Sequence, residues 1–241
     1  MDPKKKHAQK IIIALDVKEK KLALDLVKRL PHVRTFKIGL ELFTSEGPSI
    51  IQELQKQEKK IFLDLKLHDI PNTVAGAVRS GFKHRVSMMT LHASGGMNMM
   101  KRAAEQAHEL HEKTGDPKPL LLAVTVLTSL TRDELKQIGI QTNADDQVLN
   151  LAHLAKKAGM DGLVCSPKET KMIQKELGDD FLLVNPGIRP LWASSDDQKR
   201  ITTPAQAVEN GADFLVIGRP VTQAPEPSKA FGRICRELDR A

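Results

Sequence analysis

Short apolar runs alternate along the chain with amphipathic segments of helical period. Runs rich in Ile, Leu and Val occur eight times, a pattern typical of buried parallel strands. We expect these strands at 11–17, 35–40, 60–67, 86–92, 120–127, 162–166, 181–186 and 213–218. Helical patterns lie between them, near 18–30, 47–58, 72–83, 96–113, 131–138 with 145–158, 168–177, 203–210 and 226–239. Prolines stand where two helices would begin, and glycines where three would end, at Pro71, Pro204, Gly159, Gly178 and Gly211.

Eight strand–helix units in 241 residues predict a single (β/α)8 barrel, the TIM-barrel fold, as one domain over residues 1–241. A doubly wound open sheet is the main alternative, and its dinucleotide-binding form has a glycine-rich turn after the first strand. The segment from Asp16 to Lys20 contains no glycine, which favours the barrel. We expect residues 1–9, which are rich in lysine, to form a flexible basic arm.

Composition limits the possible functions. Apolar residues make up 40% and charged residues 28%, as in ordinary globular proteins. No apolar stretch approaches the roughly 20 residues that a transmembrane helix needs, so we expect no membrane span. Two cysteines, Cys165 and Cys235, are too few for a disulfide framework and favour a cytoplasmic location.

The formal net charge of +7 is compatible with nucleic acid, an anionic small substrate or simply a basic surface. Aromatic residues make up only 3%, so platforms on which bases could stack are scarce. The lysines outside the arm are also scattered rather than gathered in one stripe. We therefore expect no nucleic-acid partner.

Polar residues gather where the predicted strands end. In a barrel of this kind, the chemistry takes place at the carboxyl ends of the strands. An unpaired buried charge is costly there, so these groups must pair with one another or with a charged ligand. The residues at these ends are Asp16, Lys37, Asp64, Lys66, His92, Thr128, Ser166, Arg189 and Arg219.

The densest cluster is D-L-K-L-H-D-I-P-N-T, from Asp64 to Thr73. Alternate residues of a strand share one face, so Asp64 and Lys66 should face the barrel interior. Lys37 on the neighbouring strand and Asp69 at the following turn would complete a closed network of alternating charges. Such a network can keep a lysine protonated as a proton donor and direct carboxylates at a substrate. A purely structural salt bridge is the alternative interpretation.

Two further motifs follow the seventh and eighth strands. V-N-P-G-I-R-P (184–190) and V-I-G-R-P (216–220) each pair a glycine with an arginine. Glycine lets backbone N–H groups approach an anion, and guanidinium binds phosphate in a bidentate manner, so we expect a phosphate site here. The polar segment between them, 191–203, is long enough to be a lid. No Cys/His set has zinc spacing, and no motif requires a metal ion.

These motifs together resemble the orotidine 5'-phosphate decarboxylase family, in its bacterial branch. The resemblance covers nearly the whole chain, and its central motif is highly specific. It runs through A-L-D (14–16), F-K-I-G-L-E-L-F (36–43), F-L-D-L-K-L-H-D-I-P-N-T-V (62–74), H-A-S-G-G (92–96), A-V-T-V-L-T-S (123–129), P-G-I-R-P (186–190), D-Q-K-R (197–200) and V-I-G-R-P (216–220).

The resemblance implies decarboxylation of orotidine 5'-monophosphate without cofactor or metal. Lys66 would protonate C6 of the pyrimidine as carbon dioxide leaves. Asp64, held by Lys37 and Lys66, would sit against the departing carboxylate. The enzyme would be a homodimer in which residues of one subunit reach into the neighbouring site, namely Asp69, Ile70 and Thr73.

The resemblance also implies the substrate contacts. Asp16 and Lys37 would bind ribose hydroxyls, and Thr128 with Ser129 would bind the pyrimidine edge. The phosphate would be held by Arg189, Gln198, Gly218 and Arg219, with the segment around Gln198 closing as the lid. Asn185 stands where many relatives have Thr, and because its neighbours match we expect the reaction to be unchanged.

Two alternatives stay open. Magnesium-dependent sugar-phosphate members of the same barrel group, 3-keto-gulonate 6-phosphate decarboxylase and hexulose-phosphate synthase, share the D-x-K-x-x-D motif. They place a glutamate on the second strand, where this chain has Lys37. The other alternative is a non-catalytic barrel that binds a nucleotide without turnover.

Overall fold

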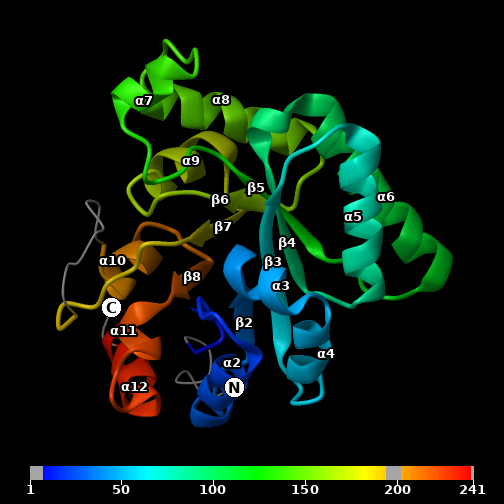
Figure 1. The fold of residues 1–241 in the computed structure, drawn as a ribbon. Coiled ribbons are helices and arrows are strands. Elements are labelled where there is room, and N and C mark those ends of the chain that lie inside the picture. The colour runs from blue at the N-terminus through cyan, green and yellow to red at the C-terminus, as the bar shows by residue number, and fades with distance from the viewer. Residues whose placement is uncertain (1–7, 194–201, 240–241) are drawn as a thin grey trace.

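The computed structural model describes residues 8–193 and 202–239. Eight parallel strands pair in sequence order, and β8 pairs with β1 to close a barrel (Figure 1). The strands are β1 (Ile11–Ala14), β2 (Thr35–Ile38), β3 (Lys60–Leu67), β4 (Met88–His92), β5 (Leu120–Val124), β6 (Gly162–Val164), β7 (Leu182–Asn185) and β8 (Phe214–Ile217). This closed barrel of alternating strands and helices confirms the predicted (β/α)8 fold.

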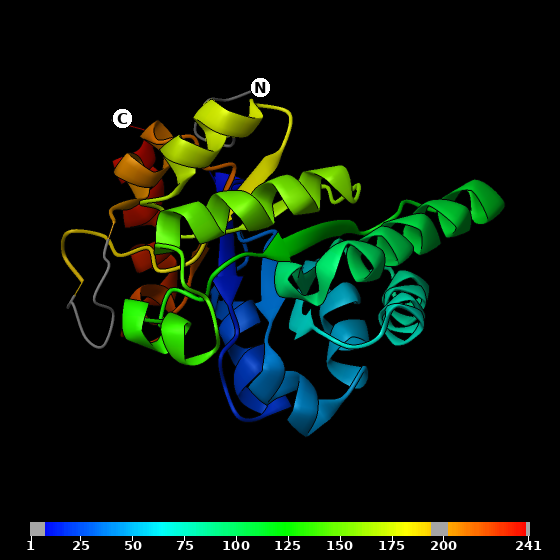
Figure 2. The same ribbon diagram turned by 90° about the horizontal axis from the view of Figure 1, so that it is seen from above.

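Helices surround the strands on the outside (Figures 1 and 2). They are α2 (Lys20–Arg29), α3 (Leu40–Glu46), α4 (Ser49–Gln55), α5 (Pro71–Lys83), η1 (Ala93–Gly95), α6 (Gly96–Thr114), α7 (Arg132–Gln137), α8 (Ala144–Lys157), α9 (Thr170–Leu177), α10 (Pro204–Glu209), α11 (Arg219–Thr222) and α12 (Pro227–Leu238). Among the residues described, no helix is long and apolar enough to cross a membrane.

Most predicted elements are present, with shorter strands. The prediction missed α3 and α11 and was wrong at the end of the second strand, which stops at Ile38 instead of residue 40. Gly39 has extended backbone angles and is the N-cap of α3, so the apolar residues that follow it belong to a helix. Pro71 and Pro204 each stand in the first turn of a helix, as expected.

The expected basic arm lies mostly outside the described residues, since 1–7 are not described. Ala8 is partly buried and packs against the core. The arm therefore remains a prediction for residues 1–7, while residue 8 already belongs to the packed body.

The core has two layers separated by the strands. The inner layer fills the barrel with side chains from alternate strand positions, namely Ile12, Ala14, Phe62, Met88, Leu122, Val184 and Val216. The outer layer packs the opposite strand faces, such as Ile61 and Leu63, against the helices. Inward and outward residues therefore alternate as the strand period requires.

Strand β3 departs from regular pairing just before its end. Leu63 pairs with Met89, but the next pair is Leu67 with Leu91, so the register shifts between them. Within this shifted stretch, Lys66 has a φ of 49°, in the left-handed region. A non-glycine residue held in such a conformation costs about 1–3 kcal/mol, so the surrounding structure must impose it.

Candidate active site

Four charged side chains alternate in sign at the carboxyl ends of β1, β2 and β3. Lys37 Nζ lies 2.9 Å from Asp16 Oδ1 and 3.4 Å from Asp64 Oδ2. Lys66 Nζ donates to both oxygens of Asp64, at 2.9 and 3.0 Å. We call these four residues, Asp16, Lys37, Asp64 and Lys66, the charge array.

The middle of the charge array is buried, whereas its ends are open. The side chains of Lys37 and Asp64 are each 10% exposed, against 60% for Asp16. Burial alone would raise the pKa of Asp64, but the nearby Lys37 and Lys66 and hydrogen bonds from Lys66 and Thr90 outweigh it and lower that pKa. Burial would likewise lower the pKa of Lys37, but the carboxylates of Asp64 and Asp16 raise it overall. Both central groups are therefore charged at neutral pH.

Thr90 on β4 joins the strained backbone to the charge array. Its fully buried hydroxyl donates to Asp64 Oδ1 at 2.9 Å and accepts the backbone N–H of Lys66 at 2.9 Å. The Thr90 hydroxyl thus accepts the Lys66 N–H, which lies where the strand register shifts. The same hydroxyl orients the Asp64 carboxylate, which in turn binds the Lys66 ammonium. This arrangement accounts for how the left-handed conformation of Lys66 is maintained.

Gly39 and His92 complete the surroundings of the charge array. A Cβ at Gly39 would lie 3.0 Å from Lys37 Nζ and 3.2 Å from Asp16 Oδ1, so glycine leaves room for that ion pair. The ring of His92 lies 5.6 Å from that of His68. Burial is the main cause that lowers the pKa of His92, with a further contribution from nearby Lys66, so its imidazole is neutral at pH 7.

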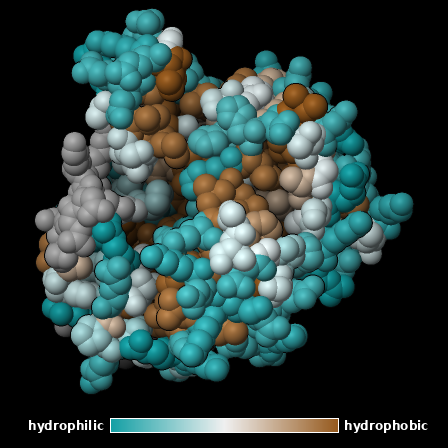
Figure 3. Space-filling view, in the orientation of Figure 1, coloured by the Kyte–Doolittle hydropathy of each residue, from teal (hydrophilic) through white to brown (hydrophobic). Residues whose placement is uncertain are grey.

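The charge array borders two pockets that share Lys37, Asp64 and Lys66, so they are two parts of one hollow. The space-filling view in Figure 3 shows a hollow in the surface, with hydrophobic residues along much of its wall. The first part has a volume of about 170 Å³ and includes Lys37, Asp64 and Lys66. Its other walls are mostly apolar and come from β5, β6 and the segments after them, including Val124, Val126, Leu127, Thr128, Val164 and Cys165. Charges on one side and an apolar wall on the other suit a flat ring with a charged substituent.

The second part of the hollow has a volume of about 280 Å³ and brings the glycine–arginine motifs to the charge array. It is lined by Gly187, Arg189, Gly218 and Arg219 together with the four residues of the array. Gly187 has a φ of 78°, which favours glycine, and the backbone N–H of Arg189 donates to Thr202 O at 3.0 Å. The loops after β7 and β8 thus place two guanidinium groups beside the array, as an anion such as phosphate would require.

Other predicted site residues lie apart from this hollow. Asp69 makes no ion pair with the described lysines, and its carboxylate instead accepts the N–H of Ile70 at 2.6 Å. Within one chain the charge array therefore ends at Lys66, and the contribution of Asp69 to a closed network stays a prediction. Thr73 and Ser129 are exposed and do not line either part of the hollow. Gln198 lies outside the described residues.

Thr90 and Gly39 belong to the site but were not predicted from the sequence. Thr90 could have been found from strand period, because it alternates with Met88, whose side chain belongs to the inner layer. Its hydrogen bonds depend on the register shift in β3, which no periodicity shows. Within the described residues, no group of three or more His, Cys, Asp or Glu side chains could hold a metal ion.

The fold and the hollow define the class of protein: a (β/α)8 barrel with side chains of alternating charge at the carboxyl ends of its strands, in a hollow that two arginines also line. The sequence model of the orotidine 5'-phosphate decarboxylase / HUMPS family matches residues 9–234. The chain therefore belongs to this family.

Similar proteins extend over almost the whole length. The chain is 49% identical over 230 residues to an orotidine 5'-phosphate decarboxylase from Nostoc sp., covering 95% of this chain and 97% of that protein. It is 51% identical over 219 residues to one from Haemophilus ducreyi, covering 90% and 94%. The crystal structure of orotidine 5'-phosphate decarboxylase from Lactobacillus acidophilus superposes with a TM-score of 0.85 at 39% identity, covering 96% of this chain and 99% of that one.

Proposed function

We propose that the protein decarboxylates orotidine 5'-monophosphate to uridine 5'-monophosphate, the last step of pyrimidine nucleotide synthesis. Family membership supports this proposal, and so do the named relatives at about half identity. The observation that carries it is the charge array, because a single hollow presents a lysine ammonium, a buried carboxylate and two arginines.

The chemical step needs an electrostatic environment and a nearby proton. The bond between C6 and the carboxylate breaks, carbon dioxide leaves, and the electron pair stays on C6. Lys66 Nζ–H then donates its proton to C6, and the lysine is reprotonated from water. Asp64, held by Lys37 and Lys66, lies beside the departing carboxylate and keeps the ammonium in place.

Binding away from the reacting carbon supports this step. We assign the ribose hydroxyls to Asp16 and Lys37, and the pyrimidine edge to Thr128 and Ser129. The phosphate is assigned to Arg189, Gln198, Gly218 and Arg219. Binding energy from the phosphate can then be used to order the charge array around the substrate.

The test follows the loss of orotidine 5'-monophosphate absorbance with EDTA present. We expect turnover by the wild type and a fall of about 10³-fold or more in Lys66→Ala, which loses the proton donor. Lys56→Ala is the matched control, because Lys56 is an exposed lysine that pairs with Glu53 on α4, away from the hollow. Activity in Lys66→Ala equal to that of the control would contradict the role of Lys66.

The EDTA condition also separates the alternatives. Activity that disappears with EDTA and returns with magnesium would assign the chain to the sugar-phosphate members of the group. A wild type that binds uridine 5'-monophosphate but never turns over substrate would be a nucleotide-binding barrel. Turnover that is unaffected by EDTA supports the decarboxylase.

We also propose a homodimer with shared sites. Asp69, Ile70 and Thr73 are exposed where α5 begins, and the apolar side chain of Ile70 is 67% exposed. A second subunit would cover Ile70, and Asp69 of the first subunit would then reach the charge array of the second. Each array would thus receive from its neighbour the carboxylate that it lacks within one chain.

Mixing inactive variants tests this arrangement. In a hybrid dimer of Lys66→Ala and Asp69→Ala subunits, one of the two sites contains both native residues. Free exchange of subunits should therefore restore about a quarter of wild-type activity. If each site used the Asp69 of its own chain, the mixture would stay as inactive as its components.

The location we propose is the cytoplasm. Both cysteines are free: Cys165 is buried and Cys235 is partly buried. Burial raises the pKa of the Cys235 thiol to about 11, so it is inert at neutral pH. Unpaired, unreactive thiols fit a reducing compartment.

A further inference from the structure

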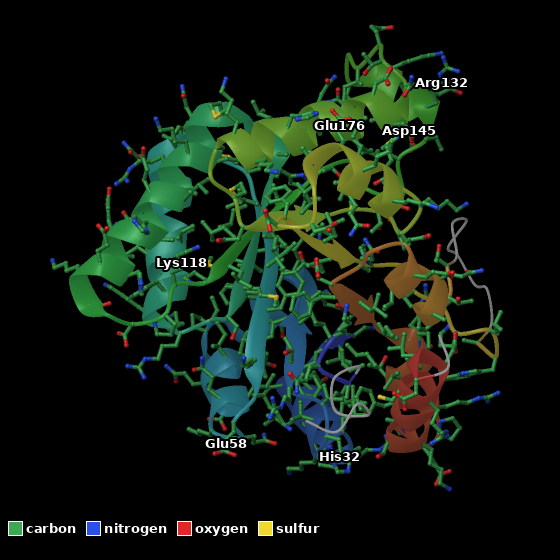
Figure 4. All side chains as sticks on the ribbon, turned by 180° about the vertical axis from the view of Figure 1, so that it is seen from behind. His32, Glu58, Lys118, Arg132, Asp145 and Glu176 are labelled. Atoms are coloured by element: carbon green, nitrogen blue, oxygen red, sulfur yellow. The ribbon has the colours of Figure 1, made fainter. Side chains whose placement is uncertain are left out.

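A second cavity lies at the amino ends of the strands, opposite the charge array. Its volume is about 630 Å³, within the range of small-molecule sites. Figure 4 labels Lys118, Glu58 and His32, which lie on the connections that lead into β5, β3 and β2. None of the described residues that are proposed to contact the substrate lines this cavity.

Cationic side chains line this cavity in a regular series. Each stands at the start of one of five successive strands or in the segment just before it, from β1 to β5. They are Lys10, Arg34, Lys60, Arg85 and Lys118. Since adjacent strands of a parallel barrel begin at the same end, the sequence positions converge on one rim.

Three of these cations are not neutralised by carboxylates among the described residues. Lys118 pairs with Asp161, and Arg85 with Asp116 at 3.6 Å. Lys10 donates to a backbone carbonyl, that of Ala212. The side chains of Arg34 and Lys60 make no ion pair or hydrogen bond with the described residues. The rim is therefore positively charged toward the cavity, which attracts an anion.

Among the described residues that line the cavity, the one acidic side chain is already engaged. Asp213 Oδ2 accepts the backbone N–H of Leu183 at 2.9 Å. Its carboxylate therefore serves a strand rather than Arg34 or Lys60. Its charge offsets only part of the positive charge around the cavity.

The floor of the cavity is apolar. It consists of the first inward side chains of the barrel and their neighbours, namely Val86, Met88, Leu120, Leu182 and Phe214. An inorganic ion would leave this floor in contact with water, whereas an organic body would cover it. The inner layer of the core, with Phe62 and Leu122, lies between this floor and the charge array.

We propose that this cavity is a binding site for a small organic anion that joins an apolar ring to a compact charged group. The ring lies on the floor around Met88 and Phe214, and the anionic group lies against Arg34 and Lys60. Binding there is independent of binding at the charge array, because the inner layer separates the two sites.

The probe for this site is 8-anilinonaphthalene-1-sulfonate, which combines an aromatic body with a sulfonate and fluoresces in apolar surroundings. Titrations of the full chain are made with saturating uridine 5'-monophosphate, so that the charge array is occupied. We expect one probe per chain and a dissociation constant at least tenfold higher in the double variant Arg34→Gln/Lys60→Gln. The matched control, Lys56→Gln/Lys229→Gln, removes two exposed lysines that pair with Glu53 and Glu226.

A second variant tests the same cavity without removing a cation. Ser87→Glu places a carboxylate among the cations and should weaken probe binding by a similar factor. Unfolding temperatures equal to that of the wild type show that the variants are folded. Absence of probe binding in the wild type, equal binding in the cavity and control variants, or displacement by uridine 5'-monophosphate would each overturn the proposal.

Discussion

Buried or half-buried carboxylates occur at both ends of the barrel, with different partners at each end. At the carboxyl ends, Asp64 lies between the ammonium groups of Lys37 and Lys66. At the amino ends, Asp161 accepts the backbone N–H of Leu121 at 2.8 Å and also pairs with Lys118, and Asp213 accepts the N–H of Leu183 at 2.9 Å. Each of these two carboxylates precedes one strand and binds its neighbour, so they fasten β6 to β5 and β8 to β7.

The partner shows what each carboxylate does. A backbone N–H is fixed by the sheet, so the oxygens of Asp161 and Asp213 that accept these N–H groups stabilise the register of the strands. The partners of Asp64 are long side chains that line a hollow, and they can turn toward a ligand without breaking the sheet. A carboxylate held only by side chains at a cavity indicates chemistry, whereas a carboxylate bound to the backbone of the sheet, even one that also has a lysine partner, indicates architecture.

The largest effect on stability is expected from Asp64→Ala, which leaves the ammonium groups of Lys37 and Lys66 side by side. Removing one partner of a buried ion pair costs about 3–5 kcal/mol, and the lower end applies here because Lys37 keeps Asp16. We expect the free energy of unfolding to fall by about 3 kcal/mol in urea denaturation, together with loss of activity. A variant as stable as the wild type would show that the array is strained rather than stabilising.

The pH dependence of stability sharpens the contrast between the two ends. The pKa of Asp64 is lowered in the folded state, so its contribution is complete above about pH 4 and is lost as pH falls through the folded pKa. The pKa of Lys37 is raised, so its contribution is complete below about pH 10 and is lost as pH rises through the folded pKa. The difference in unfolding free energy between wild type and Asp64→Ala should therefore be flat from about pH 5 to 9 and shrink outside this range. A difference that changes steadily across neutral pH would contradict this assignment.

A smaller effect on activity than that of Asp64→Ala is expected from Thr90→Val. This change keeps the side-chain shape and removes the hydroxyl between Lys66 N–H and Asp64. A hydrogen bond to a charged group contributes about 1.5–3 kcal/mol. With Asp64 less well oriented, we expect kcat to fall about tenfold while KM changes little.

Thr90→Ser is the matched control, because it keeps the hydroxyl and should restore most of kcat. A merely structural role would lower the unfolding temperature of both variants and leave kcat near the wild-type value. The split between kcat and KM therefore distinguishes a positioning role from simple loss of packing.

The fold was largely predictable because strand period and helix period differ so clearly along this chain. The positions of Asp64 and Lys66 on one inward face also followed from period alone. The turn at Gly39 did not, because K-I-G-L continues an apolar run and its helical continuation depends on backbone angles.

The remaining features of the site arise from contacts between segments distant in sequence. The left-handed conformation of Lys66 is imposed by pairing with β4 and by the hydroxyl of Thr90, 24 residues away in the chain. The separation of Asp69 from the array could not be predicted either. The D-x-K-x-x-D motif does not distinguish its two carboxylates, and only the folded structure shows that Asp64 pairs with Lys66 whereas Asp69 does not. The grouping of cations around the amino-end cavity could not be predicted, because each is an ordinary polar residue at or before the start of a strand. Only closure of the barrel brings them together.

The smallest effect on stability is expected at the amino ends, from Asp213→Ala. This change leaves the N–H of Leu183 without its acceptor, which costs about 1 kcal/mol of unfolding free energy and leaves kcat unchanged. Asp213→Asn keeps a side-chain oxygen for that N–H and should retain nearly all of the stability. Because Asp213 also contributes a negative charge to the lining of the second cavity, both variants should bind the sulfonate probe more tightly than the wild type. Loss of activity in Asp213→Asn would contradict the division between the two ends, since a carboxylate that only fastens a strand should not affect chemistry at the opposite rim.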